Sequence, residues 1–196
     1  IKKEAFALHG RTLVGAAAAI LTYNRGLIDA LAPIVPAVKP QAAYYEMYGW
    51  QGVRVLAETI RYARSKGMFV ITDGKRNDIG ATMEAYAAAH LGATEIEGKT
   101  EEAFGADALT VNGYLGSDGI RPLLQVCAER DKGIFVLVKT SNASSGELQD
   151  QQLEGGNTVY RAMGDFCEEW GRELPGRFGY SGVGAVVGAT YPAQLG

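Results

Sequence analysis

Short apolar runs alternate with longer amphipathic stretches along this chain, which is the pattern of repeated βα units that build a parallel sheet. The short runs are rich in β-branched residues and nearly continuous in hydrophobicity, as strands covered on both faces require. They predict five strands, at residues 34–39, 68–73, 108–112, 133–139 and 183–188. Apolar residues at helical spacing predict five helices, at residues 15–32, 49–66, 79–91, 119–130 and 158–170. Gly67 is placed to end the second helix.

This order of elements predicts the α/β class but leaves the closure of the sheet open. Five strands do not close a barrel, so the pattern alone also allows an open five-stranded sheet. Glycines and small polar residues follow the strand ends, where the loops of βα folds carry their chemistry. The site is therefore expected at those ends. The polar, glycine-rich residues 144–157 predict a mobile loop.

Composition narrows the class of protein. The chain has 196 residues, 47% of them hydrophobic, which suits one globular domain with a real core. A net charge of −3 gives no reason to expect nucleic-acid or membrane binding, although a local basic pocket for a phosphorylated small molecule remains compatible with it. No apolar run approaches the ~20 residues of a membrane span.

The cysteines and histidines carry no recognisable site. Cys127 and Cys167 lie in helix-like stretches outside any CxxC or Cys/His cluster, so we expect buried or half-buried thiols. Such thiols are consistent with a cytoplasmic location. His9 and His90 are too few and too isolated for a metal site or a histidine-based triad.

The sharpest constellation is Asp73-x-Lys75-x-x-Asp78 at the end of the second predicted strand. On an extended backbone Asp73 and Lys75 project to the same face. Two neighbouring carboxylates would hold Lys75 protonated, and an ordered ammonium in a closed pocket is a proton donor. The alternatives are structural: Asp78 caps the following helix, and Asp73 with Lys75 forms a surface ion pair of little consequence.

Lys39 ends the preceding predicted strand, directly after an apolar run. A lysine there is costly unless it is paired or lies at a solvent-accessible mouth. In a parallel barrel Lys39 and Asp73 come from adjacent strand ends, so we expect them to pair. The alternative is a lysine that extends to solvent at the edge of the sheet.

The motif Asp73-x-Lys75-x-x-Asp78-Ile79-x-x-Thr82 resembles the signature of the orotidine 5′-phosphate decarboxylases, and the resemblance runs essentially from end to end. The Asp-x-Lys-x-x-Asp core is shared with a wider superfamily, whereas its combination with Lys39 and a Ser-Asn loop is more specific. Four further segments match in the family's order, in its longer bacterial branch: 38–41, 109–116, 138–142 and 187–192.

The resemblance implies a (β/α)8 TIM barrel with about five of its eight strands represented here. It implies cofactor-free conversion of orotidine 5′-phosphate (OMP) to uridine 5′-phosphate (UMP) in pyrimidine biosynthesis. Asp73 would lie beside the substrate carboxylate, Lys75 would protonate C6, and Lys39 would bind ribose and bridge the acids. Asp78, with Ile79 and Thr82, would reach into the active site of the neighbouring subunit of an obligatory homodimer. Six further residues would contact the substrate or line its pocket: Ile79, Thr82, Asn112, Ser141, Asn142 and Thr190.

Two departures from the family pattern are visible. Residues 1–196 contain no counterpart of the family's first strand, which carries a ribose-binding Asp. They also contain no counterpart of its last two βα units, which hold the phosphate-binding loop. We therefore expect a single barrel domain that is incomplete at both ends. The missing parts are expected to lie outside the given chain; the alternative is a fragment that cannot close a barrel. Gly74 and Gly113 replace bulkier residues or proline of many relatives, with modest expected effects.

Three other functions remain open. A sugar-phosphate decarboxylase or aldolase of the same superfamily would use Mg²⁺, but a cation at Lys39 would repel the metal that those relatives bind through a glutamate there. A Schiff-base aldolase needs a lysine of depressed pKa, and the flanking acids act in the opposite direction. A non-catalytic phosphate-binding barrel, or an inert fragment, is the third.

Overall fold

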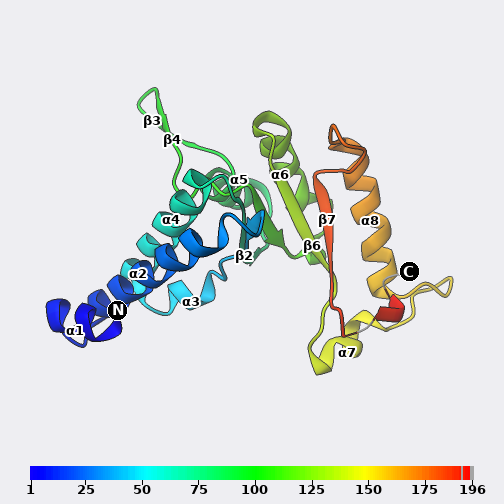
Figure 1. Cartoon of the computed structure of the whole chain (residues 1–196). Coiled ribbons are helices and arrows are strands. Elements are labelled where there is room, and N and C mark those ends of the chain that lie inside the picture. Colours follow the sequence, from blue (N-terminus) through cyan, green and yellow to red (C-terminus); the bar gives the residue numbers. More distant parts are fainter. Residues whose placement is uncertain (191, 195–196) are drawn as a thin grey trace. The chain divides into compact units, whose positions relative to one another are not determined.

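The computed structural model of the protein describes residues 1–190 and 192–194 (Figure 1). Its contacts divide the chain into two compact units. The first comprises Ile1–Gly74 and Ala88–Leu109, and the second comprises Lys75–Ala87 and Thr110–Gly196.

Five strands form one sheet in the hydrogen-bonded order β1-β2-β5-β6-β7. Their bounds are β1 Ala37–Val38, β2 Phe69–Arg76, β5 Ala108–Val111, β6 Gly133–Lys139 and β7 Val183–Val187. The pairs β1–β2 and β6–β7 are parallel, as the βα alternation predicts. All five predicted strands are present, and β6 has the predicted bounds.

The predicted bounds of the first two sheet strands are wrong. β1 keeps only two of the six expected residues. Pro36 and Pro40 flank it, and proline has no N–H to continue a ladder. β2 runs three residues beyond Asp73, to Arg76. Lys75 therefore lies within the strand rather than after it.

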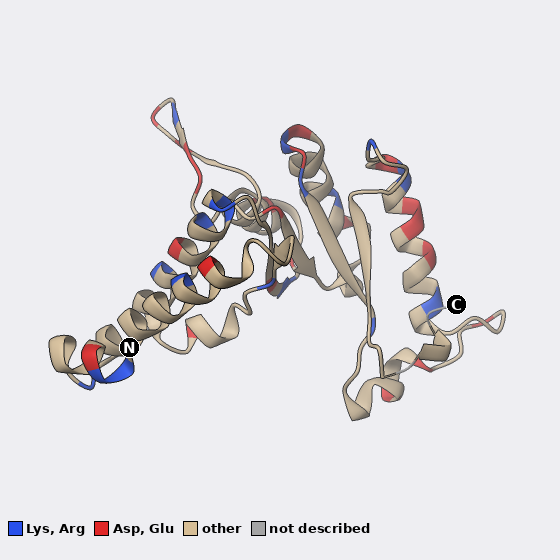
Figure 2. Ribbon diagram, in the orientation of Figure 1, with Lys and Arg blue, Asp and Glu red and all other residues tan. Residues whose placement is uncertain are grey.

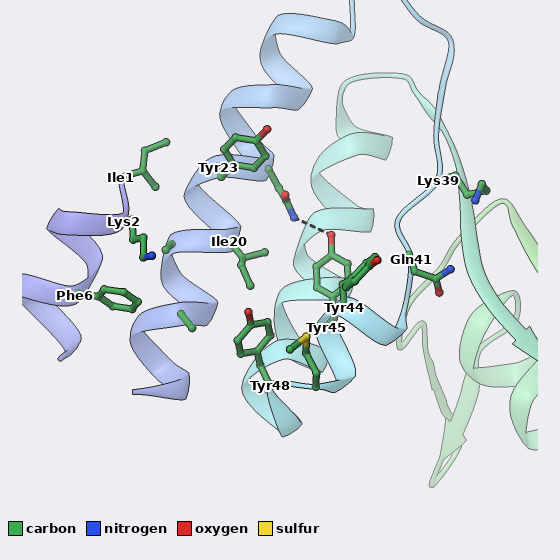
Figure 3. Close-up of a pocket in the computed structure, with 14 residues that line it drawn as sticks. Ile1, Lys2, Phe6, Ile20, Tyr23, Lys39, Gln41, Tyr44, Tyr45 and Tyr48 are labelled. Atoms are coloured by element: carbon green, nitrogen blue, oxygen red, sulfur yellow. Dashed lines mark hydrogen bonds between the residues drawn. The ribbon is translucent and has the colours of Figure 1, made fainter. Parts of the chain in front are cut away.

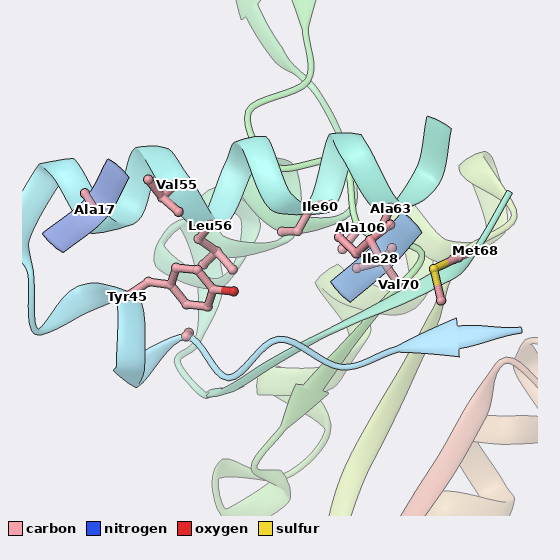
Figure 4. Packing of buried hydrophobic residues seen from close by; sticks show 11 residues of the cluster. Ala17, Ile28, Tyr45, Val55, Leu56, Ile60, Ala63, Met68, Val70 and Ala106 are labelled. Atoms are coloured by element: carbon pink, nitrogen blue, oxygen red, sulfur yellow. The ribbon is translucent and has the colours of Figure 1, made fainter. Parts of the chain in front are cut away.

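The first unit contains a helical layer packed on its strands. Its helices are α1 Lys2–His9, α2 Leu13–Leu31, α3 Ala43–Glu46 and α4 Gly49–Ser65. α2 packs against α4, and Figure 4 shows apolar side chains of α4 meeting Met68 and Val70 at β2. α4 ends as predicted, because Gly67 has a φ of 79° and donates its N–H to the carbonyl of Arg64.

The first unit also contains a hairpin that the sequence analysis missed. β3 Thr94–Ile96 pairs antiparallel with β4 Lys99–Glu101, and Glu97 and Gly98 at the turn both have positive φ. Every residue of both strands is exposed. The hairpin has no buried face, so no alternation of apolar and polar residues marks it in the sequence.

The second unit places helices against β6 and β7. Beyond α5 Gly80–His90, which it shares with the first unit, it contains α6 Ser117–Arg130, α7 Gly146–Gln149 and α8 Val159–Glu173. α8 lies along β6 and β7 (Figure 1). Short 3-10 turns lie at η1 Gly113–Leu115, η2 Ala143–Ser145 and η3 Pro192–Gln194. Part of the expected loop at 144–157 is thus helical, since it contains α7 and the last two residues of η2.

Both cysteines are buried, as predicted. Burial raises the pKa of the Cys127 thiol to about 12 and that of Cys167 to about 11, so both are protonated at neutral pH. Charges of both signs are interspersed along the helices (Figure 2). Among the described helices, none combines the length and the apolar character that crossing a membrane requires.

Candidate active site

Lys39 and Asp73 meet where β1 and β2 end. The ammonium nitrogen of Lys39 lies 2.6 Å from Oδ2 of Asp73. The Lys39 side chain is 52% exposed, whereas that of Asp73 is 7% exposed. The pairing predicted from adjacent strand ends is confirmed. Its geometry presents an ammonium at the surface and holds the carboxylate beneath it.

Gln41 is a second partner of Asp73. It lies in the matched segment 38–41, and the sequence analysis assigned it no role. Its side-chain amide donates to the same Oδ2 at 2.9 Å. The backbone supports this arrangement, because Asp73 N–H donates to the carbonyl of Pro40 and Ala42 N–H donates to that of Asp73. The chain after β1 thus stays hydrogen-bonded to β2, and this contact fixes Lys39 and Gln41 over one carboxylate.

Lys75 has a left-handed backbone, with a φ of 48°. This conformation costs a non-glycine residue about 1–3 kcal/mol and is concentrated at functional sites. The Lys75 N–H donates to Oγ1 of the buried Thr110 at 3.0 Å, which helps to hold this backbone conformation. The assumption of an extended backbone from Asp73 to Lys75 is therefore wrong. The direction of the exposed Lys75 side chain is set by this left-handed conformation instead of by strand alternation.

Asp78 lies between β2 and α5 and is half-buried. Its Oδ1 accepts the backbone N–H of Ile79 at 2.9 Å, one residue before α5 begins at Gly80. The carboxylate thus accepts a backbone N–H just before the helix begins. This resembles the alternative in which Asp78 caps the following helix. Ile79 and Thr82 are both exposed. Whether Lys75 and Asp78 group with the Lys39–Asp73 pair stays a prediction of the sequence.

Ser141 and Asn142 lie in the exposed loop after β6. Thr140 organises the loop: its hydroxyl donates to Oδ1 of Asn142 at 2.6 Å, and its N–H donates to Oε1 of Gln149 at 2.9 Å. The loop after β7 passes directly over Ser141, because a Cβ on Gly188 would lie only 2.8 Å from the Ser141 Cβ. Glycine is therefore required at position 188 so that the loops after β6 and β7 can approach each other.

The remaining two predicted residues have different surroundings. Asn112 uses its side-chain oxygen to accept the N–H of Tyr114 at 3.0 Å, which caps η1. It also borders a small hollow of about 140 Å³ with Thr140 and Gln149. Thr190 is exposed in the loop after β7. Asn112 therefore has a structural task besides the substrate contact predicted for it.

A cavity of about 720 Å³ lies among α1, α2 and α3 and reaches Lys39 and Gln41 (Figure 3). Its wall is mostly apolar and aromatic, including Ile20 and Tyr48. Tyr45 also lines it, and burial raises the pKa of this phenol. An apolar wall suits a phosphorylated anion poorly, so only the end at Lys39 enters the candidate site.

The described residues do not suggest a metal centre. Within 1–190 and 192–194, no group of three or more His, Cys, Asp or Glu side chains is arranged to hold an ion. At Asp73, Oδ2 already accepts an ammonium and an amide. A divalent cation would have to displace Lys39 there.

The strand order and the charged strand ends define a class of protein, the βα-barrel proteins whose chemistry lies at the carboxyl ends of the strands. Within that class, the chain belongs to the Orotidine 5′-phosphate decarboxylase / HUMPS family, which it matches over residues 22–195.

Curated relatives extend this result. The orotidine 5′-phosphate decarboxylase of Rhodopirellula baltica is 49% identical over 179 residues, which are 91% of this chain and 58% of the relative. That of Caldicellulosiruptor saccharolyticus is 45% identical over 171 residues, 87% of this chain and 56% of the relative. The chain thus spans somewhat more than half the length of these relatives.

Solved structures agree with the fold. The Leishmania donovani OMP decarboxylase superposes with a TM-score of 0.77 at 34% identity, covering 95% of this chain and 65% of the other. The Leishmania donovani UMP synthase gives the same TM-score and identity, covering 94% of this chain and 36% of the other. These neighbours confirm the predicted class, a (β/α)8 barrel with five of its strands in this chain.

Proposed function

We propose that the protein decarboxylates OMP to UMP, as a carboxy-lyase of pyrimidine biosynthesis that needs no cofactor. The observation that carries this proposal is the Lys39–Asp73 pair, with its 2.6 Å contact at adjacent strand ends, in a member of this family. A cytoplasmic location goes with this function as a prediction.

The chemistry demands a fixed positive charge. Loss of CO2 from OMP leaves a carbanion-like centre at C6, and an ammonium already in place stabilises it without reorganisation. We assign this task and the protonation of C6 to Lys75. Its strained backbone supports the assignment, because observed strain of this kind is concentrated where a side chain must be aimed.

The other charges hold the substrate and Lys75. Asp73 would lie beside the leaving carboxylate, and its low exposure fits a role in a closed pocket. Lys39 would bind the ribose while remaining paired with Asp73. Ser141 would bond the pyrimidine, Asn112 and Asn142 would line its pocket, and Thr190 would lie near the phosphate-gripping region. Binding energy from the phosphate would drive closure around these groups.

The alternatives fit less well. A Mg²⁺-dependent sugar-phosphate enzyme would need a metal-binding acid where this chain has Lys39, and that ammonium already occupies Oδ2 of Asp73. A Schiff-base lysine must attack a carbonyl carbon with its side-chain nitrogen, whereas the nitrogen of Lys39 is held by the Asp73 carboxylate at 2.6 Å.

The direct test measures UMP formation from OMP by the purified protein, with and without EDTA. We expect decarboxylation at the same rate in both, because no step requires a divalent ion. Activity that EDTA removes and Mg²⁺ restores would favour the metal-dependent relatives. A folded protein that forms no UMP would leave the non-catalytic barrel as the better interpretation.

We also propose that active sites are shared across a homodimer through Asp78, Ile79 and Thr82. The exposure of Ile79 and Thr82 supports this, since both are available to a second copy. Mixing inactive Lys75→Ala and Asp78→Ala protomers should restore activity, because one site of each hybrid dimer receives an intact Lys75 and an intact Asp78. Random exchange makes half of the dimers hybrid, so recovery should approach about a quarter of the wild-type activity.

A matched mixture separates sharing from other effects. Lys75→Ala combined with Asp73→Asn should recover nothing, because both changes lie in the part of the site that one protomer supplies. Verified heterodimers of Lys75→Ala with Asp78→Ala that stay inactive would contradict the shared site. Equal recovery in both mixtures would contradict it as well.

A further inference from the structure

Lys139, the last residue of β6, is a buried lysine that the proposed mechanism does not use. Its side chain is 1% exposed. Its ammonium lies 2.6 Å from Oδ1 of Asp150 and 3.4 Å from Oγ of Ser145. It also lies 5.6 Å from the centre of the Tyr160 ring, within the range of a cation–π contact. A buried charge requires such partners.

These partners come from three successive pieces of the chain after β6. Ser145 ends η2, Asp150 directly follows α7, and Tyr160 is in the first turn of α8. One ammonium therefore ties the end of β6 to the middle of the segment 140–158 and to the first turn of α8, which follows that segment. This segment carries Ser141 and Asn142, the residues proposed to meet the pyrimidine.

The backbone of Lys139 is also specialised. The register between β6 and β7 shifts between Leu137 and Lys139, and such irregularities re-aim side chains beside functional sites. The carbonyl of Lys139 accepts the N–H of Gly188 at 2.7 Å, which is the glycine that lets the β7 loop pass over Ser141. Lys139 thus contacts both the segment that carries Ser141 and the β7 loop that passes over Ser141.

A stabilising role alone does not account for this arrangement. Burying an ion pair contributes little net stability, because the loss of hydration offsets the attraction. It does restrict geometry, since any movement of the segment away from Lys139 would leave an ammonium buried without acceptors. Asp150 is 50% exposed, so it can be hydrated if the lysine is removed.

We infer that Lys139 is a positioning residue, which holds the segment 140–158 so that Ser141 and Asn142 meet the pyrimidine base of the substrate. This inference rests on the proposed function. It assigns Lys139 no contact with the reacting atoms. Its effect should therefore appear in substrate binding more than in the chemical step.

The test compares Lys139→Met with wild type in two measurements, OMP kinetics and amide hydrogen exchange across 140–158. We expect kcat/KM to fall roughly 100-fold, mostly through KM, because displaced contacts of about 1 Å have effects of this size. Exchange of the segment should accelerate at least about tenfold. Lys139→Arg should retain most of the wild-type kcat/KM and most of the wild-type protection from exchange, because it keeps the charge. Lys99→Met, in the exposed hairpin, is the control and should change neither.

The outcomes separate the two proposals. Wild-type KM in a folded Lys139→Met protein overturns the positioning role, whether or not its exchange changes. If Lys139→Met does not fold, Asp150→Asn replaces it, because this half-exposed carboxylate can be neutralised without burying a new group. A wild-type protein that forms no UMP contradicts the proposed function instead. In that case, hydrogen exchange in Lys139→Met still tests whether Lys139 holds the segment 140–158. Faster exchange supports this role, and unchanged exchange overturns it.

Discussion

Replacing Lys75 with alanine is expected to abolish OMP decarboxylation and to leave the fold intact. The ammonium both stabilises the charge that develops at C6 and supplies the proton, so its loss should reduce kcat/KM by roughly 10⁴-fold or more. The side chain is exposed, so its removal should leave the core packing unchanged. Alanine keeps the Cβ, so the left-handed backbone at this position is as strained in the variant as in wild type.

Single-turnover formation of UMP is the measurement, together with circular dichroism and the Tm of the variant. Lys99→Ala is a suitable control, because Lys99 is an exposed lysine that pairs with Glu101 in the β3–β4 hairpin. It removes the same charge from an exposed strand that contains none of the candidate residues. A folded Lys75→Ala protein with wild-type turnover would refute the proton-donor role.

Replacing Asp73 with asparagine should have the second-largest effect. Asparagine keeps the shape of the side chain but removes the charge that faces Lys39 at 2.6 Å and Gln41 at 2.9 Å. We expect decarboxylation to fall by roughly 10²–10³-fold, the size seen when one fixed electrostatic partner is lost. The free energy of unfolding should fall by only about 1–2 kcal/mol, because Lys39 is half-exposed and can be rehydrated.

Kinetics and urea denaturation measure the two effects separately. Asp29→Asn is the matched control, since Asp29 forms an ion pair with Lys66 at 2.7 Å in the same unit. That pair lies on the surface, so its neutralisation should change neither activity nor, measurably, stability. An Asp73→Asn protein that decarboxylates OMP at the wild-type rate would remove Asp73 from the mechanism. A variant that loses activity only in proportion to unfolded protein would make Asp73 a purely structural residue.

The periodicity of apolar residues was sufficient to predict most elements of the fold. The β-branched runs located all five sheet strands, and helical spacing located α2, α4, α5, α6 and α8. These signals are local, because a covered strand and an amphipathic helix each require their own arrangement of apolar residues. The hairpin at β3 and β4 escaped because it is exposed throughout and buries nothing that a pattern could report.

For the candidate site, the sequence by itself placed Lys39, Asp73 and Ser141 at strand ends and identified the family through the motifs around them. Tertiary structure alone decided that Gln41 shares the Asp73 carboxylate, that Lys75 has a left-handed backbone, and that Lys139 is buried against Asp150. Lys39 and Lys139 both end an apolar strand, yet one lies 52% exposed and the other 1%. The physical reason is that burial and pairing depend on side chains that folding brings in from elsewhere in the chain. A strand pattern specifies which way a residue faces and leaves open what covers it.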